Sequence, residues 1–247
     1  MNIQRYKGQL YEKVKWRKTI SGKLYEKLHT SNSIIGKLYK KTFIAPIYPY
    51  FNENKVLERI CKKGFTIIDV GGNVGSFSNI NKKNVNYTRL DIDPSTKPNI
   101  IADALHLPFK DNSADVIIAK AIFEHIKDPF ATVSEIYRVL KKDGILFSLV
   151  PFFYRIHASP SDFYRFTKDG LKYLLKEFKK TEIKPCGGYM SALGNCFYIG
   201  TYALDSLLGF GFLIRVISWP FLRLLSYLDI FDKYQLTPTY YYAISVK

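Results

Sequence analysis

The chain has 247 residues, of which 47% are apolar and 23% charged, so a disordered or collagen-like chain is excluded. Its three cysteines show no Cys-x-x-Cys spacing and are too few for a disulfide framework, so we expect a reducing, cytoplasmic environment. Lys and Arg outnumber Asp and Glu by 37 to 21, and the net charge of +16 favours an anionic partner.

Most of this charge lies in a basic N-terminal arm, which we place at residues 1–50. Residues 1–63 hold 15 Lys and Arg against 4 Asp and Glu. A Gly-x-Leu-Tyr repeat begins at Gly8, Gly22 and Gly36, and its 14-residue period is about four helical turns. We expect helices suited to an anionic membrane surface, with a solvated or partly disordered arm as the alternative. The first 20 residues contain six basic residues and no apolar stretch, so no signal peptide is expected.

From residue 51 the pattern alternates between helix and strand, and we assign residues 51–190 to a core domain. The helix predicted over 130–140 is expected to end at residues 141–144, with Gly144 just after its last turn. Thr167 is expected to cap the helix predicted over 167–178. Such alternation predicts an α/β fold with a doubly wound, mostly parallel sheet. Helices are predicted over 54–63, 130–140 and 167–178, and strands over 66–70, 87–92, 99–102, 115–119, 145–150 and 240–246.

An apolar, aromatic segment at residues 191–238 precedes the closing strand at 239–247. No stretch in it reaches 18 residues without a charge or a proline, so a membrane-spanning helix is not favoured. We expect two amphipathic helices over 196–231, broken at Trp219 and Pro220. They would cap the core, line a substrate mouth or lie in a bilayer interface.

A glycine-rich turn follows the first strand and predicts a nucleotide-binding edge. Residues 69–75 read Asp-Val-Gly-Gly-Asn-Val-Gly, where small residues let the backbone bend sharply and approach a ligand. Asp91 ends the second strand 20 residues after Gly71, which is the spacing expected for a carboxylate on ribose hydroxyls. Asp93, one step out of phase, is expected to form a turn before Pro94.

Together these motifs resemble class I S-adenosylmethionine-dependent methyltransferases of the type 11 group. The resemblance rests on Asp-x-Gly-x-Asn-x-Gly at 69–75, Leu-Asp-Ile-Asp at 90–93 and Ala-Asp-Ala-Leu-His-Leu-Pro-Phe at 102–109. It continues through 111–117, Phe-Glu-His-Ile at 123–126 and 135–144, so it covers about residues 55–180. Asn73 and Ala114 depart from the usual pattern. The resemblance implies a seven-stranded Rossmann-like sheet and S-adenosylmethionine as the cofactor.

The resemblance also implies roles for single residues. The turn after the first strand would cradle the methionine part of the cofactor, Asp91 would hold the ribose and Asp103 the adenine amino group. No residue is assigned to a metal. The implied cofactor-binding residues are Asp69, Gly71, Gly72, Asn73, Gly75, Asp91, Asp103, Ala104, Leu105 and Lys120.

Residues 151–167, after the fifth strand, are the expected acceptor loop. They resemble a stretch found in members associated with surface-polysaccharide and glycolipid biosynthesis. There His157 would be a base, and Asp162 would orient it or bind acceptor hydroxyls; alternatively Asp162 pairs with Arg165 in a rigid loop. His125 also lies near the carboxyl edge, where it would either take part in catalysis or organise the following helix.

The function predicted from the sequence is O-methylation of a saccharide or lipid-linked glycan precursor at the cytoplasmic membrane face. One alternative is an RNA methyltransferase, suggested by the basic arm, although no RNA-binding signature is visible. A second is a non-catalytic, membrane-associated binding protein with the same fold. A nicotinamide oxidoreductase is disfavoured because the first turn lacks a Gly-x-Gly-x-x-Gly pattern.

Overall fold

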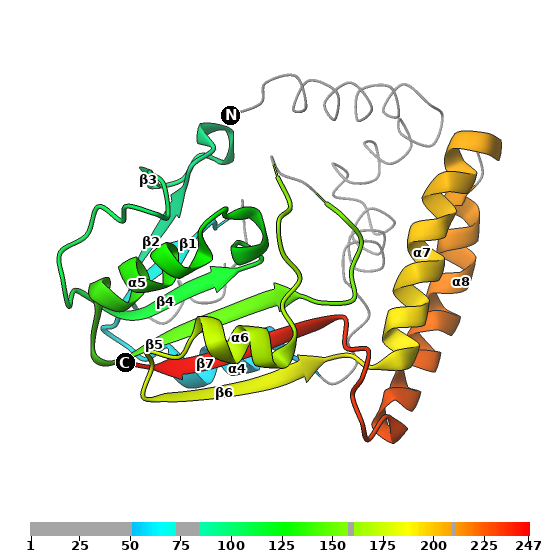
Figure 1. Cartoon of the computed structure of the whole chain (residues 1–247). Coiled ribbons are helices and arrows are strands. Elements are labelled where there is room, and N and C mark those ends of the chain that lie inside the picture. The colour runs from blue at the N-terminus through cyan, green and yellow to red at the C-terminus, as the bar shows by residue number, and fades with distance from the viewer. Residues whose placement is uncertain (1–50, 73–83, 158–160, 209–210) are drawn as a thin grey trace. The chain divides into compact units, whose positions relative to one another are not determined.

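In the computed structural model, the described residues are 51–72, 84–157, 161–208 and 211–247 (Figure 1). The basic arm lies outside them. The described chain forms two compact units. The first contains residues 51–186 and 238–247, and the second contains residues 187–237.

The first unit is built on one seven-stranded sheet with the order β3-β2-β1-β4-β5-β7-β6. Neighbouring strands from β3 to β5 run parallel, whereas β7 runs antiparallel to both β5 and β6. This confirms the mostly parallel sheet predicted from the sequence. The strands are β1 (Thr66–Val70), β2 (Asn86–Asp91), β3 (Ile100–Ile101), β4 (Ala114–Lys120), β5 (Leu140–Pro151), β6 (Lys180–Cys186) and β7 (Tyr240–Val246).

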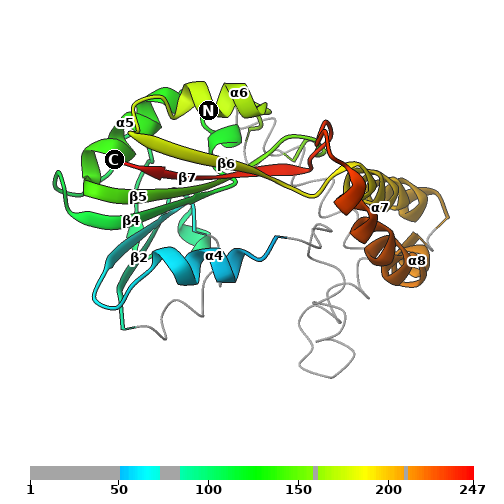
Figure 2. The same ribbon diagram turned by 90° about the horizontal axis from the view of Figure 1, so that it is seen from below.

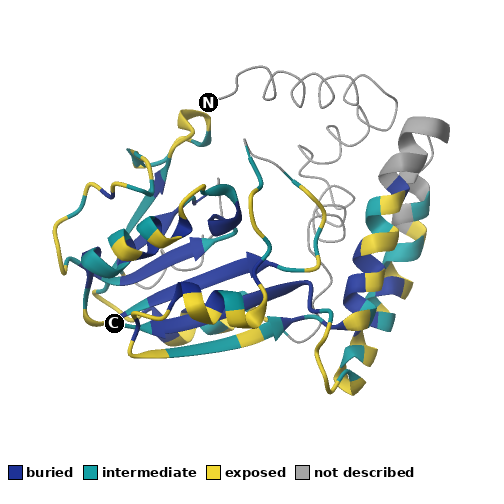
Figure 3. Ribbon diagram, in the orientation of Figure 1, coloured by how far each residue is buried: buried dark blue, intermediate teal, exposed yellow. Residues whose placement is uncertain are grey.

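Helices cover both faces of the sheet, with α5 (Pro129–Val139) and α6 (Lys168–Leu174) on one side and α4 (Glu53–Ile60) on the other (Figure 2). Each helix begins at a side-chain cap, which satisfies backbone N–H groups that lack a helical partner. Thr167 accepts a hydrogen bond from the Gly170 N–H, so the predicted cap of α6 is confirmed. Between the helices the central strands are buried along most of their length (Figure 3).

The segment from Lys141 to Gly144 is not the helix end that the sequence predicted. α5 stops at Val139, and Leu140 is already extended and paired with Ala114. The register of β4 and β5 then shifts, so residues 141–144 form an irregularity within β5. Within it Asp143, and not Gly144, takes the left-handed conformation, with φ of 61°. Strand pairing with β4 has therefore overridden the helix-ending signal.

The second unit is a helical hairpin formed by α7 (Tyr189–Leu208) and α8 (Gly211–Leu225), followed by a 3-10 turn, η4 (Ser226–Phe231). The expected break at Trp219 and Pro220 is wrong, because α8 continues through Pro220. Pro220 itself is exposed. Among the described residues, no helix is long and apolar enough to cross a membrane.

One carboxylate fastens the beginning of α7 to η4. Asp229 accepts hydrogen bonds from the backbone N–H groups of Gly188 and Met190 at 2.9 and 2.7 Å, and from both the N–H and the hydroxyl of Ser191. A negative charge at a helix N-terminus also interacts favourably with the helix dipole. Asp229 therefore joins the two ends of the hairpin.

Candidate functional site

The candidate site lies where the parallel strands end. The chain runs from β1 outward to β2 and β3, then crosses back to β4 on the other side of β1. In open α/β sheets, ligands bind at the carboxyl ends of the strands on either side of such a reversal. The segments that begin at Gly71, Asp91 and Ala121 leave the sheet at this edge.

A tight backbone turn follows β1, and its geometry requires glycine twice. Gly71 has φ of +71°, and a Cβ atom there would lie 2.2 Å from Cγ2 of Ile122. A Cβ atom on Gly72 would lie 2.6 Å from Oδ2 of Asp69. A larger residue at either position would require the side chain of Ile122 or Asp69 to move, and at Gly71 it would also strain the backbone. Asn73 and Gly75 lie outside the described residues.

Two further carboxylates stand on the ends of β2 and β3, and each is oriented by a local hydrogen bond. Oδ1 of Asp91, the last residue of β2, accepts from the Asp93 N–H at 2.9 Å. Oδ1 of Asp103 accepts from the Leu105 N–H at 3.0 Å. Ala104 packs against the hydrophobic core. The edge thus presents two carboxylates, each with an oxygen held by a local backbone hydrogen bond.

Asp69 differs from these two carboxylates because it is buried, with 1% of its surface exposed. Burial raises its pKa to about 6, although the Tyr87 hydroxyl donates to it and the positive charge of Lys120 acts in the opposite direction. Lys120, the last residue of β4, pairs with Glu53 at 2.7 Å. The carboxylate of Asp69 therefore lies against Gly72 of the turn, and its burial makes the charged form unfavourable.

We expect Asp69→Asn to stabilise the unliganded protein above pH 6. A carboxyl whose folded pKa lies above its ordinary 3.8 contributes stability that is complete below that value and lost as pH rises through about 6. A shift of about two units corresponds to about 3 kcal/mol, and asparagine carries no such penalty while still accepting from Tyr87. Urea unfolding of the parent and of Asp69→Asn at pH 4.5 and 7.5 measures this difference in the free energy of unfolding. Equal pH dependence in both proteins would contradict the expectation.

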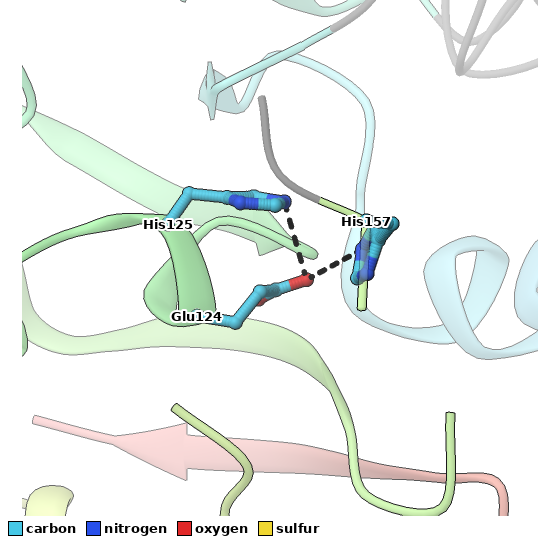
Figure 4. Close-up of side chains that lie close together, drawn as sticks. All are labelled: Glu124, His125 and His157. Carbon is cyan, nitrogen blue, oxygen red and sulfur yellow. Dashed lines mark ion pairs between the residues drawn. The ribbon is translucent and has the colours of Figure 1, made fainter. Parts of the chain in front are cut away.

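A second cluster joins the segments that follow β4 and β5. Glu124 and His125 lie in η3 (Phe123–His125), and His157 lies in the loop after β5 (Figure 4). Oε1 of Glu124 is 3.7 Å from Nε2 of His125 and 3.6 Å from Nε2 of His157. Both imidazoles therefore point toward one carboxylate, and two of the three expected catalytic residues lie together.

The third, Asp162, is held by Arg165. Its carboxylate bonds two guanidinium nitrogens and accepts from the His157 N–H at 2.8 Å. The hydrogen bond from Arg165 lowers the pKa of Asp162 to about 2. Asp162 is therefore ionised at neutral pH and a weak base, and it fastens the loop that carries His157. Of the two expected alternatives, pairing with Arg165 is the one observed.

Glu124 is the site residue that the sequence analysis did not single out. Its side chain is fully buried, with 0% of its surface exposed. The backbone carbonyl of Glu124 accepts from the Phe163 N–H at 2.7 Å, which joins η3 to the acceptor loop. The Phe-Glu-His-Ile stretch at 123–126 was the signal in the sequence, but nothing local reveals that a glutamate will be buried.

Comparison with known proteins shows what this region is similar to. Residues 68–148 match the family model described as "Methyltransferase domain". An uncharacterized protein of Methanocaldococcus jannaschii is 35% identical over 96 residues, which cover 36% of this chain and 42% of that protein. This chain therefore spans less than half the length of that relative.

Two solved structures share the fold. A SAM-dependent methyltransferase from Archaeoglobus fulgidus is 17% identical, with a TM-score of 0.53 over 78% of this chain and 92% of its own. The [4+2]-cyclase SpnF is 16% identical, with a TM-score of 0.55 over 92% of this chain and 95% of its own. At these identities the likeness concerns the fold alone.

S-adenosylmethionine is the cofactor that the family and the fold imply, and the described residues fit it. A turn in which a Cβ atom at Gly71 or Gly72 would collide leaves the backbone open to a ligand. Asp91 and Asp103 offer acceptors for ribose hydroxyls and for an adenine amino group. Residues 68–148 are therefore similar to a methyltransferase domain, and they lie on a sheet with the fold seen in S-adenosylmethionine-dependent enzymes.

Proposed function

We propose that the protein transfers a methyl group from S-adenosylmethionine to an acceptor hydroxyl. One observation carries the proposal: the glycine turn with Asp91 and Asp103, and the cluster of Glu124 with two histidines, lie at the same edge of one sheet. Strands β1 and β4 are direct neighbours in that sheet, so donor and acceptor groups would lie side by side.

On the donor side, the chain has to bind and align. When bound, S-adenosylmethionine supplies a methyl group on a positively charged sulfur. Asp91 would hold the ribose hydroxyls by charge-assisted hydrogen bonds, and Asp103 would accept from the adenine amino group. The backbone of Gly71 and Gly72, with Asn73 and Gly75, would lie along the methionine part. Alignment of this kind accounts for much of the rate in a displacement reaction.

On the acceptor side, His157 would accept the hydroxyl proton. Its loop is fixed by Asp162 and Arg165, and its ring lies edge-on to that of His125, with the centroids 5.0 Å apart. An imidazole held in place by hydrogen bonds suits proton transfer near neutral pH. Asp162 would position His157 and would not itself take the proton, because its own pKa is about 2.

We propose a saccharide or lipid-linked glycan precursor at a membrane surface as the acceptor. The helical unit supports this, because large apolar side chains of α8 and η4 are mostly exposed, among them Ile217, Leu224, Ile230 and Phe231. The basic arm in the sequence would add attraction to anionic lipids, and an apolar surface with a basic segment is a combination that gives stable peripheral attachment.

An RNA methyltransferase and a non-catalytic, membrane-associated binding protein remain the alternatives. The first rests on the net charge of +16, which favours any polyanion. The second rests on the shared fold alone, since a fold can be kept without its chemistry.

One experiment separates these proposals. The full chain is incubated with methyl-labelled S-adenosylmethionine and anionic vesicles that contain extracted lipid-linked glycans, and separately with RNA from the same cells. We expect floated vesicles to carry both the protein and the label, with less of both at high salt. Label in RNA alone would favour the RNA enzyme. Protein that stays below the vesicles at low salt would end the membrane proposal.

A further inference from the structure

We propose that Glu124, His125 and His157 bind a divalent transition-metal ion, with Zn²⁺ as the preferred metal. One ligand atom from each lies within 4.8 Å of the other two. The two carboxylate–imidazole distances, 3.7 and 3.6 Å, are close to the roughly 3.4 Å between neighbouring ligand atoms around tetrahedral zinc. Figure 4 shows both imidazoles paired with the one carboxylate of Glu124.

The carboxylate of Glu124 is the first argument for a cation. Both of its oxygens are buried, and among the described residues neither has a hydrogen-bond partner. A buried carboxylate without a partner is costly, whereas a metal ion would compensate its charge. Arg165 interacts with Glu124 only at a distance, because its guanidinium already bonds Asp162 and the carbonyl of Arg155.

The second argument comes from the outer nitrogens of the two imidazoles. Nδ1 of His125 lies 2.6 Å from the carbonyl oxygen of Ser161, and Nδ1 of His157 lies 3.1 Å from that of Arg155. A carbonyl oxygen can only accept, so each Nδ1 carries the proton. In a neutral imidazole, Nε2 then presents a lone pair toward Glu124. This is the outer hydrogen bonding that orients histidine ligands in metal sites.

The donor set indicates which ion would bind. Two imidazole nitrogens and one carboxylate oxygen suit Zn²⁺ and its transition-metal neighbours, whereas Mg²⁺ prefers oxygen ligands and retains its water. Three protein ligands also leave one position open, as in catalytic zinc sites. If the proposed function holds, an acceptor hydroxyl at that position would be acidified by the metal and would lose its proton to solvent water, so His157 would then act as a ligand in place of its role as a base.

The test measures binding and needs no methyl acceptor. The full chain without a histidine tag is stripped with a chelator, and zinc binding is measured by competition with a chromophoric chelator. We expect one Zn²⁺ per chain, no displacement by Mg²⁺, and visible absorption when Co²⁺ replaces it. Cys196→Ser is included as a background variant, because this exposed thiol can bind zinc on its own.

His125→Ala, His157→Ala and Glu124→Gln should each weaken zinc binding by at least about tenfold. His106→Ala is the matched control, since His106 is exposed and outside the cluster, and it should bind zinc like the parent. Thermal unfolding shows whether each variant is folded. Because His157 lies on a loop, the His157→Ala variant still tests the proposal if Glu124→Gln fails to fold. Absence of stoichiometric zinc in the folded parent, or undiminished binding in the folded variants, would overturn the proposal. Neither result depends on methyl transfer.

Discussion

Turnover of the His157→Ala protein is expected to fall by about 10²–10⁴-fold, while its affinity for the cofactor stays unchanged. His157 lies on the acceptor side of the edge, after β5, and makes its contacts with Glu124, Asp162 and Arg155. Most of the proposed cofactor residues lie at or after the ends of β1, β2 and β3 instead. Loss of the imidazole would therefore slow the chemical step by about 3–5 kcal/mol without disturbing the donor.

The control for this prediction is His106→Ala, which should keep turnover within a few-fold of the parent. Turnover is measured with labelled cofactor at saturating acceptor, and cofactor affinity by calorimetry with S-adenosylhomocysteine. If His157→Ala retained near-parental turnover, His157 would have no catalytic role, either as a base or as a metal ligand.

Asp91→Ala should weaken cofactor binding by about 1.5–3 kcal/mol, or about 10- to 150-fold. The reason is the loss of charge-assisted hydrogen bonds to the two ribose hydroxyls. The same carboxylate also accepts from the Asp93 N–H, so its removal could loosen the turn after β2. Asp91→Asn separates these effects, because the side-chain oxygen of asparagine can still accept from the Asp93 N–H, while the charge and one acceptor oxygen are lost.

Asp93→Ala is the matched control for the cofactor site. Asp93 lies two residues further along and caps the 3-10 turn η2 (Pro94–Thr96) by accepting from the Ser95 N–H at 2.8 Å. Its removal should cost little affinity, since its carboxylate is engaged in the turn. Calorimetry measures the cofactor affinity of all three folded variants. An unchanged affinity in Asp91→Ala would contradict the assignment of Asp91 to the ribose.

The central strands could be predicted from the sequence because their local pattern and their tertiary setting agree. Thr66–Val70 and Tyr240–Val246 are rich in β-branched or aromatic residues, and both were predicted with the bounds observed. β6 (Lys180–Cys186) was missed, since it mixes charged residues with Pro185. It lies at the edge of the sheet and pairs only with β7, where such residues are tolerated.

The candidate site was predictable in its residues and not in its contacts. Glycine and aspartate reveal turns and strand ends by spacing along the chain, which is how Gly71 and Asp91 were found. The approach of His125 to His157 depends on how two loops 32 positions apart fold over adjacent strands. The burial of Glu124 depends on the same folding, so no local pattern contains it.

The position of β7 has a consequence for how the protein is made. β7 pairs with β5 on one side and β6 on the other, yet the helical unit of residues 187–237 precedes it in the chain. During synthesis, β5 and β6 are therefore made before β7, the strand that pairs with both, and the whole hairpin is translated in between. Until then β5 has an open edge and β6 has no pairing, the condition in which nascent chains aggregate or recruit chaperones. A chain truncated between residues 187 and 237 would thus lack β7, and its sheet could not be completed.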